Sequence, residues 1–335
     1  MQYVYDKKYD TFCFQNCMNY ILKTNGIKDS DLYINKSLSL LVDKKEGYIL
    51  KYHFDEDCYN LVSSYSHKVQ MFRSDKDSET VIEEVMNNDN SDIGIIMGVD
   101  SFELPYLPFY KKSHGLHSVV VKSVDFSNRT ISISDCMSPW FFEGEVSLDD
   151  FLAARRSQNT SDGGMFSGIK INNIWKEISN KGYTASIEQL IKEQIDLTLQ
   201  QFYYGEENSE LAAGICALNY ILDKMRDSRT VSEINQNELL ESVHRIIYRY
   251  NHRRIFWTSF LDSIPEKLRS EILVEYQENY ELLQGDWEKL LYKILMLKLR
   301  KKEKLWDDVI NSFQYVIDEE IKLGIPLEEY ARNVI

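Results

Sequence analysis

The chain has 335 residues, a formal net charge of −14 and an isoelectric point near 5.0, with 43% hydrophobic and 13% aromatic residues. A chain of this length exceeds the usual size of one compact core, so we expect two domains. The acidic charge argues against a nucleic-acid partner, and the apolar runs are too short for a membrane span. The opening "MQYVYDKKYD" lacks the apolar core of a signal peptide, so we expect a cytoplasmic protein with reduced thiols.

The first predicted helix begins near Cys13. Its apolar positions recur at the spacing of one helical face, and these positions are Phe14, Cys17, Met18, Ile21 and Leu22. Gly26 follows where a helix commonly ends in a left-handed residue, and Asp10 or Thr11 can cap the first turn. Cys17 lies inside the apolar face, so we expect it to be a small buried side chain.

Cys13 lies at the start of this helix, and its chemistry differs from that of Cys17. The free N–H groups and the positive dipole end of a helix N-terminus lower the pKa of a thiol and favour the nucleophilic thiolate. A disulfide between the two cysteines is not expected in a reducing compartment. A zinc site is not expected either, because no second Cys or His pair follows at ligand spacing. Cys13 is therefore a candidate nucleophile.

Short β-rich runs bounded by turn residues follow, among them "DIGIIMGVD", "HSVVVKSVD" and "RTISISD". The helical patterns in this part are "SETVIEEVMNN" and "SLDDFLAARR", and the loop "SQNTSDGG" precedes one more predicted strand, "MFSGIKI". Beyond Trp175 the chain shows successive amphipathic helices, the first with a Ser186–Gln189 capping box and two others at residues 266–283 and 287–299. These patterns predict an α+β domain with an antiparallel sheet over residues 1–172 and an all-helical domain over residues 173–335.

A cysteine nucleophile needs a base and a group that orients the base. His117 begins the run "HSVVVKSVD", and Asp135 ends the next run after the turn "DFSNRT". Two antiparallel strands joined by that turn bring these residues side by side, so that Asp135 accepts the Nδ1 proton and Nε2 faces the thiol. The order of Cys13, His117 and Asp135 is that of papain-like folds. His114, in the preceding loop, is the rival base.

The chain resembles the butirosin-type (BtrH-like) acyltransferases, which are relatives of the papain-like, bacteriocin-leader-cleaving cysteine peptidases. The resemblance rests on Cys13 followed by Gly26, on the strand and turn "IIMGVDSFELPY", and on "HSVVV" followed by Asp135. It covers most of the chain, since these acyltransferases also carry a helical C-terminal domain. It implies a papain-like first domain and acyl transfer without ATP. An acyl group passes from the phosphopantetheine thioester of an acyl or peptidyl carrier protein to Cys13, and an amine then removes it as an amide.

The resemblance also bears on the acceptor side of the site. Asp100 in "GVDSF" and Tyr106 in "LPY" are candidates to line it, with Asp100 attracting a cationic amine, and His114 is a further substrate-binding candidate. The alternative is that Asp100 ends a strand and that Tyr106 belongs to a turn fixed by Pro105. The implied acceptor is a small amine, such as an amino sugar or the diamine used in closthioamide assembly within this family. The resemblance implies no metal and no other cofactor.

Two positions depart from the pattern of these families. The peptidases carry a Gln six residues before the nucleophile, where this chain has Lys7, and the acyltransferases often have His-Cys, where this chain has Phe12 before Cys13. The predicted oxyanion hole therefore consists of the Cys13 backbone N–H with the side chain of Gln15 or Asn16.

An acidic carrier protein needs a local basic patch, for which Arg155, Arg156, Arg253 and Arg254 are candidates, with a structural role as the alternative. Two other functions stay open on the sequence. One is a papain-like cysteine hydrolase, either a peptidase or a thioesterase, that gives the acyl group to water. The other is a non-catalytic binding module in which Cys13 is inert.

Overall fold

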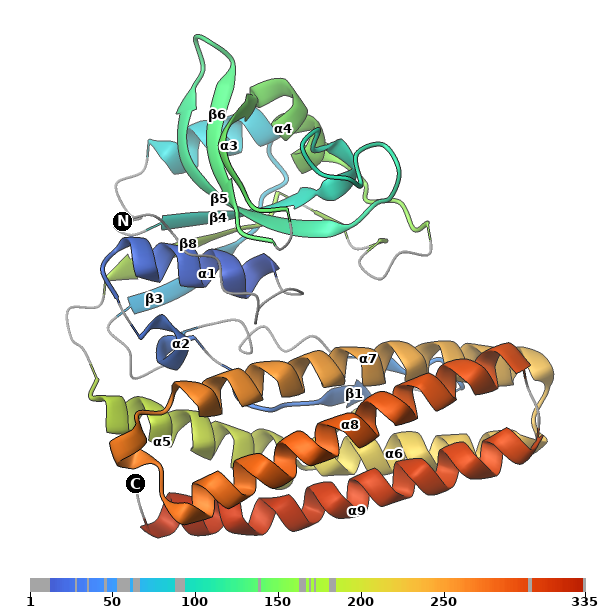
Figure 1. Ribbon diagram of the computed structural model, residues 1–335. Helices are drawn as coiled ribbons and strands as arrows, with labels where there is room; N and C mark the ends of the chain where they lie inside the picture. The colour runs from blue at the N-terminus through green and yellow to red at the C-terminus, as the bar shows by residue number, and fades with distance from the viewer. Residues whose placement is uncertain are drawn as a thin grey trace. The chain divides into compact units, whose positions relative to one another are not determined.

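The computed structural model describes residues 13–27, 29–34, 36–44, 47–52, 61–62, 67–87, 94–137, 140–162, 167–168, 170–171, 173–180, 185–300 and 303–333. The chain forms two compact units, the first made of Met1–Ile34 with Tyr59–Ala185 and the second of Asn35–Cys58 with Ser186–Ile335. The elements of both units are drawn in Figure 1. Within these described ranges, no helix is long and apolar enough to cross a membrane.

The first unit is built on an antiparallel sheet whose described strands have the order β3-β8-β4-β5-β6-β7. Its strands are β3 (His67–Phe72), β4 (Gly94–Asp100), β5 (Leu116–Asp125), β6 (Thr130–Asp135), β7 (Phe142–Ser147) and β8 (Trp175–Asn180). Its helices are α1 (Cys13–Thr24), α2 (Ser30–Tyr33), α3 (Ser78–Met86) and α4 (Leu148–Arg156), and a 3₁₀ turn (Ser101–Glu103) follows β4. The predicted α+β class and antiparallel sheet are confirmed.

Different helices cover the two faces of this sheet. Alternate residues of a strand point to opposite faces, and Ile95, Met97 and Val99 of β4 pack in one buried cluster with side chains of α3 and α4. Gly94 points to the other face, where a Cβ would come within 2.8 Å of the Ile21 side chain of α1. Glycine at position 94 therefore lets α1 pack closely on β4, and Figure 1 shows α1 on the face opposite α3 and α4.

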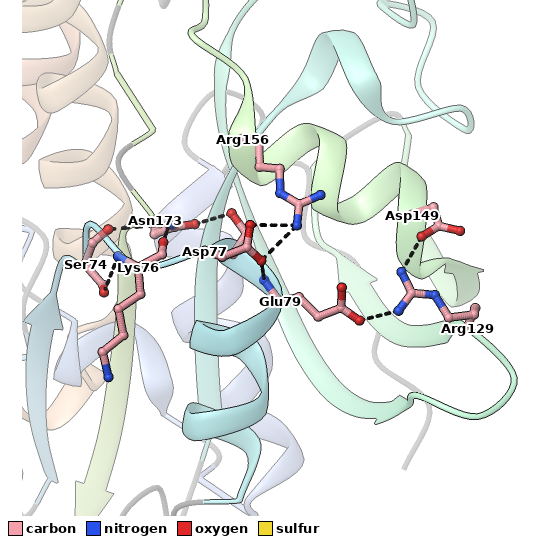
Figure 2. Close-up of polar contacts among 9 residues, drawn as sticks. Ser74, Lys76, Asp77, Glu79, Arg129, Asp149, Arg156 and Asn173 are labelled. Carbon is pink, nitrogen blue, oxygen red and sulfur yellow. Dashed lines mark hydrogen bonds and ion pairs between the residues drawn. The ribbon is translucent and has the colours of Figure 1, made fainter.

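Polar side chains tie the start of α3 to the end of α4 (Figure 2). Asp77 caps α3 by accepting a hydrogen bond from the Glu79 N–H at 2.9 Å, and Arg156 at the end of α4 donates to both Asp77 oxygens at 2.8 Å. Arg129, in the turn between β5 and β6, pairs with Glu79 and with Asp149 in the first turn of α4. These contacts hold α4 against the hairpin of β5 and β6, which carries two of the predicted site residues.

The second unit consists of helices and a small sheet. Its elements are β1 (Leu41–Asp43), β2 (Lys51–Tyr52), α5 (Ile187–Thr198), a π-helical turn (Leu199–Tyr203), β9 (Leu211–Ala213), α6 (Gly214–Asp227), a 3₁₀ turn (Ser228–Thr230), α7 (Glu233–Ser263), a second 3₁₀ turn (Glu266–Leu268), α8 (Glu271–Arg300) and α9 (Glu303–Asn333). A buried ion pair between Arg254 and Glu320 joins α7 to α9. The Arg254 guanidinium also lies 3.9 Å from the centre of the Tyr280 ring of α8, so charged and aromatic side chains share this core.

The boundary between the units differs from the predicted one. β8 pairs with both β3 and β4, so the first unit continues past residue 172 to Ala185. The described residues of the strand predicted at 165–171 form no strand. The second unit is not all-helical, because β9 pairs with β1 and the segment Asn35–Cys58 belongs to this unit. Pairing between strands far apart in the chain leaves no local pattern, which explains why the boundary and the small sheet differ from the prediction.

The long helices of the second unit also differ from their predicted lengths. The helices predicted at 266–283 and 287–299 form the single helix α8. Residues 284–286, including Gly285, separate the two predicted helices, but the buried stripe continues through them at helical spacing, at Tyr276, Tyr280, Leu283, Trp287, Leu290, Ile294 and Leu297. A continuous buried face outweighs the small cost of one glycine inside a helix. The predicted capping box of Ser186 and Gln189 is confirmed at the start of α5.

Candidate active site

Four neighbouring strands meet at one end of the sheet of the first unit. β4 ends at Asp100, opposite Leu116 at the start of β5. β6 ends at Asp135, opposite Phe142 at the start of β7. His117 is the second residue of β5, and β5 and β6 form the predicted antiparallel hairpin. The predicted base and both predicted carboxylates therefore lie at the same end of the sheet.

Cys13 is the first residue of α1 and is half-buried. Gly26 ends this helix with a φ of +86° and with the two backbone hydrogen bonds of a Schellman motif. Cys17, one turn after Cys13, is fully buried, as predicted. The predicted caps Asp10 and Thr11 lie outside the described residues. The buried face of α1 packs on β4 and β5, and Cys13 begins this helix.

His117 interacts with both of the other predicted residues. Its Nε2 lies 2.7 Å from Asp135 Oδ2, so Nδ1 is the ring nitrogen left to face Cys13, whose charge and side chain also act on the ring. The ring orientation predicted from the sequence, with Asp135 on Nδ1, is therefore wrong. Val120 pairs with Ser134, so Asp135 lies diagonally from His117 rather than directly opposite. The more distant ring nitrogen, Nε2, is the one that spans such a diagonal.

The charges in this group favour a thiolate beside an imidazolium. Burial lowers the pKa of His117, but the charge and hydrogen bond of Asp135, together with Cys13, outweigh burial and hold that pKa well above its usual value. Burial raises the pKa of Cys13, but the hydrogen bond and charge of His117, with a hydrogen bond from Ser118, outweigh burial and leave the pKa lowered. The helix N-terminus acts in the same direction. The group thus has the properties of an activated cysteine nucleophile.

Asp100 is fully buried and accepts four hydrogen bonds. Its Oδ1 accepts from the N–H groups of Phe102 and Gly115, each at 3.0 Å. Its Oδ2 lies 2.7 Å from His114 Nδ1 and accepts from the Ser157 hydroxyl. Burial raises the pKa of Asp100, but these hydrogen bonds hold it below its usual value. A carboxylate has about four acceptor positions, so these hydrogen bonds fit the alternative in which Asp100 ends a strand, and attraction of a cationic amine stays a prediction. Asp100 holds the loop between β4 and β5.

His114 belongs to the cluster around Asp100. Its ring stacks on Phe102 with 4.1 Å between the ring centres, and its backbone N–H donates to Asp162 at 2.8 Å. None of the contacts between described side chains joins His114 to Cys13. His117, rather than the rival base, therefore lies in the cysteine group, and substrate binding by the partly exposed His114 stays a prediction.

Tyr106, predicted either for the acceptor side or for a turn, contacts Asp135. Its hydroxyl donates to Asp135 Oδ2 at 2.9 Å, and its ring stacks on Phe142 with 4.3 Å between the centres. The turn itself is present, since the Leu107 N–H donates to the Leu104 carbonyl at 3.1 Å. No sequence pattern indicates the contact with Asp135, because 29 positions separate the two residues. Tyr106 thus lies in the predicted turn, but its hydrogen bond to Asp135 was not predicted.

The predicted oxyanion donors lie in the first turn of α1. Gln15 and Asn16 are both fully buried. Successive helical residues are rotated by about 100°, so Asn16 shares the side of α1 that carries Cys13, whereas Gln15 projects from nearly the opposite side. This geometry favours the Cys13 backbone N–H with Asn16 as the predicted pair of donors. Lys7 and Phe12, where the chain departs from the families, lie outside the described residues.

Three of the four arginines predicted to dock a carrier protein are buried, and the fourth, Arg156, is exposed. Arg155, Arg253 and Arg254 are buried. Arg155 donates to two backbone carbonyls, and burial lowers its pKa to about 9. Arg156 is exposed but pairs with both oxygens of Asp77. A docking patch needs exposed charges, so the structural alternative holds for the three buried arginines, and docking by the exposed Arg156 stays a prediction.

Comparison of the chain with protein-family models and with characterised proteins gives no match. Among the described residues, no group of three His, Cys, Asp or Glu side chains is arranged to hold a metal ion. The geometry of Cys13, His117 and Asp135 is therefore the main evidence on function.

Proposed function

We propose that the protein is an ATP-independent, amide-forming acyltransferase of natural-product biosynthesis that acts in the cytoplasm. Cys13 is the nucleophile, His117 the acid and base, and Asp135 the residue that orients His117. The proposal is supported most directly by one observation: the His117 Nε2 lies 2.7 Å from Asp135 Oδ2 while the same ring interacts with Cys13 at the start of α1. We also propose that the first unit has a papain-like fold of the butirosin acyltransferase type.

In the first step, the Cys13 thiolate attacks the carbonyl carbon of an acyl thioester on the phosphopantetheine arm of an acyl or peptidyl carrier protein. The carbonyl electrons move to oxygen, where N–H donors at the start of α1 stabilise the charge. The bond from carbon to the donor sulfur then breaks, and the leaving thiol takes the proton held by His117. The step leaves an acylated Cys13, a neutral His117 and a free donor thiol.

In the second step, a small amine, such as a diamine or an amino sugar, attacks the acyl carbon. Neutral His117 accepts a proton from the attacking nitrogen through the ring nitrogen that faces Cys13. The Cys13 thiolate leaves, the amide is released, and the starting ion pair is restored. No ATP and no resident cofactor takes part, because the free energy comes from the conversion of a thioester into an amide.

Incubation with an acyl-pantetheine thioester tests the covalent step. Intact-protein mass spectrometry should detect one acyl adduct, which Cys13→Ala should lose. Cys216, a half-exposed thiol on α6, provides the matched control, and Cys216→Ala should keep the adduct. The absence of an adduct with any thioester would contradict both acyl transfer and the alternative cysteine hydrolase.

Addition of amines to the acylated protein then separates the two enzyme classes. Formation of an amide, with loss of the adduct at a rate that depends on amine concentration, supports the acyltransferase. If free acid alone forms, the protein is a peptidase or a thioesterase, and the proposal is wrong.

A further inference from the structure

Tyr106 donates its hydroxyl to the same Asp135 oxygen that binds the base. Asp135 Oδ2 lies 2.9 Å from the Tyr106 hydroxyl and 2.7 Å from His117 Nε2. The other oxygen, Oδ1, accepts the Met137 N–H at 3.1 Å. Since Asp135 is fully buried, these three donors replace water around its carboxylate.

Packing fixes the Tyr106 side chain in this position. Its ring stacks almost parallel on Phe142 of β7, with an angle of 13° between the planes. Leu104 and Leu107 on either side are buried and joined by a backbone hydrogen bond. Burial and the charge of Asp135 hold the pKa of Tyr106 far above its usual value, so the phenol stays protonated and remains a donor.

This inference rests on the proposed acyl transfer. We propose that Tyr106 is a positioning residue, whose hydroxyl holds Asp135 against His117 and draws off part of the negative charge that the carboxylate presents to the ring. Two donors share one oxygen, so each limits the charge available to the other. His117 therefore stays protonated beside the Cys13 thiolate. Its imidazolium is still acidic enough to release the proton to the leaving thiol.

The other titratable groups near the carboxylate are thiols. Cys13 contacts His117, and the buried Cys17 and Cys136 lie close to Asp135 and Tyr106. Burial, followed by the contact with Cys136, raises the pKa of Cys17 well above its usual value, so this thiol is uncharged. Among the described residues, the hydrogen bonds of Tyr106 and His117 therefore dominate the charge balance at Oδ2.

The variant Tyr106→Phe keeps the ring that packs on Phe142 and removes the hydroxyl. More of the Oδ2 charge then acts on His117, and an opposite charge nearby stabilises the imidazolium. We expect the titration of His117 to move to higher pH by about half a unit to one unit. Release of the proton to the leaving thiol should become slower, while Cys13 remains a thiolate.

The test measures the rate of Cys13 alkylation by iodoacetamide as a function of pH, read by mass spectrometry on the peptide that contains Cys13. Alkylation needs no acyl donor, so it reports the ion pair independently of the substrate. The first transition marks thiolate formation and the second marks deprotonation of His117. Tyr106→Phe should shift the second transition upward. Tyr20→Phe, which removes a hydroxyl bonded to Glu143 at 3.1 Å, should leave it unchanged.

An unchanged second transition in Tyr106→Phe, with thermal unfolding like that of the wild type, overturns the inference. If this variant does not fold, a ring-fluorinated tyrosine at position 106, which is a stronger donor, should move the transition to lower pH; no movement again overturns the inference. A wild-type profile with one ordinary thiol titration that His117→Ala does not alter would instead refute the proposed function, and the inference with it.

Discussion

The variant Asp135→Asn measures how much the carboxylate contributes to the ion pair of Cys13 and His117. Asp135 accepts hydrogen bonds from His117 and Tyr106 on Oδ2 and from the Met137 N–H on Oδ1. Asparagine keeps the shape of the side chain but is neutral. One of its two terminal atoms is an NH2 group, so in either orientation a donor faces a donor.

The expected loss follows from the hydrogen bond between His117 Nε2 and Asp135 Oδ2, at 2.7 Å. A hydrogen bond to a charged group contributes about 1.5–3 kcal/mol, and one pKa unit corresponds to about 1.36 kcal/mol. The pKa of His117 should therefore fall by roughly one to two units. Burial disfavours the imidazolium, and in the variant no carboxylate at position 135 offsets this effect of burial. The equilibrium constant between the ion pair and the neutral pair should therefore fall by roughly 10- to 100-fold, and the rate of Cys13 acylation at neutral pH should fall by up to that factor.

The assay is the release of free thiol from an acyl-pantetheine in a single turnover, followed across pH. In Asp135→Asn the alkaline transition should move to lower pH and the maximal rate should drop. Asp162→Asn is the matched control, because Asp162 accepts the backbone N–H of His114 and lies outside the cysteine group. An Asp135→Asn enzyme with the rate and pH profile of the wild type would show that the carboxylate does not support the base, and would refute the reasoning.

Three other substitutions test neighbouring conclusions. His117→Ala should nearly abolish acylation of Cys13, because it removes the ring that contacts the thiol, whereas His114→Ala should keep most of it; the reverse order of rates would move the base to His114. Asp77→Ala should lower the free energy of unfolding by about 1 kcal/mol in urea denaturation, because α3 loses its N-cap, and no change would show that the cap contributes nothing. Glu320→Gln should lower the free energy of unfolding by about 3–5 kcal/mol, because the buried Arg254 loses its counter-ion. Equal stability in urea denaturation would show that the pair makes no net contribution.

Local contacts are the part of this structure that the sequence predicts well. Gly26 ends α1 through hydrogen bonds to residues within one turn, and Ser186 and Gln189 cap α5 across three positions. The turn before β6 is likewise local, since Asp125 accepts the N–H groups of Ser127 and Asn128 at 2.9 Å. Such contacts depend on a few neighbouring residue types, and short patterns therefore encode them.

The sequence did not predict which distant strands pair or how far the long helices continue. β8 joins the sheet between β3 and β4, although its own short run of residues shows no preference for that place. The helix α8 continues through Gly285 because its buried face is set by the helices packed on it.

At the candidate site, the sequence by itself predicted the group of Cys13, His117 and Asp135, with His114 as the rival base and Asp100 and Tyr106 on the acceptor side. The tertiary structure decided which atoms meet and where Asp100, His114 and Tyr106 lie. It pairs Asp135 with His117 through Nε2 and Asp100 with His114, and it brings Tyr106 onto Asp135. The physical reason is that the direction of a side chain and the path of a loop depend on packing against residues far away in the chain. Strand register and loop packing therefore make one carboxylate part of the cysteine group and the other a support for the loop.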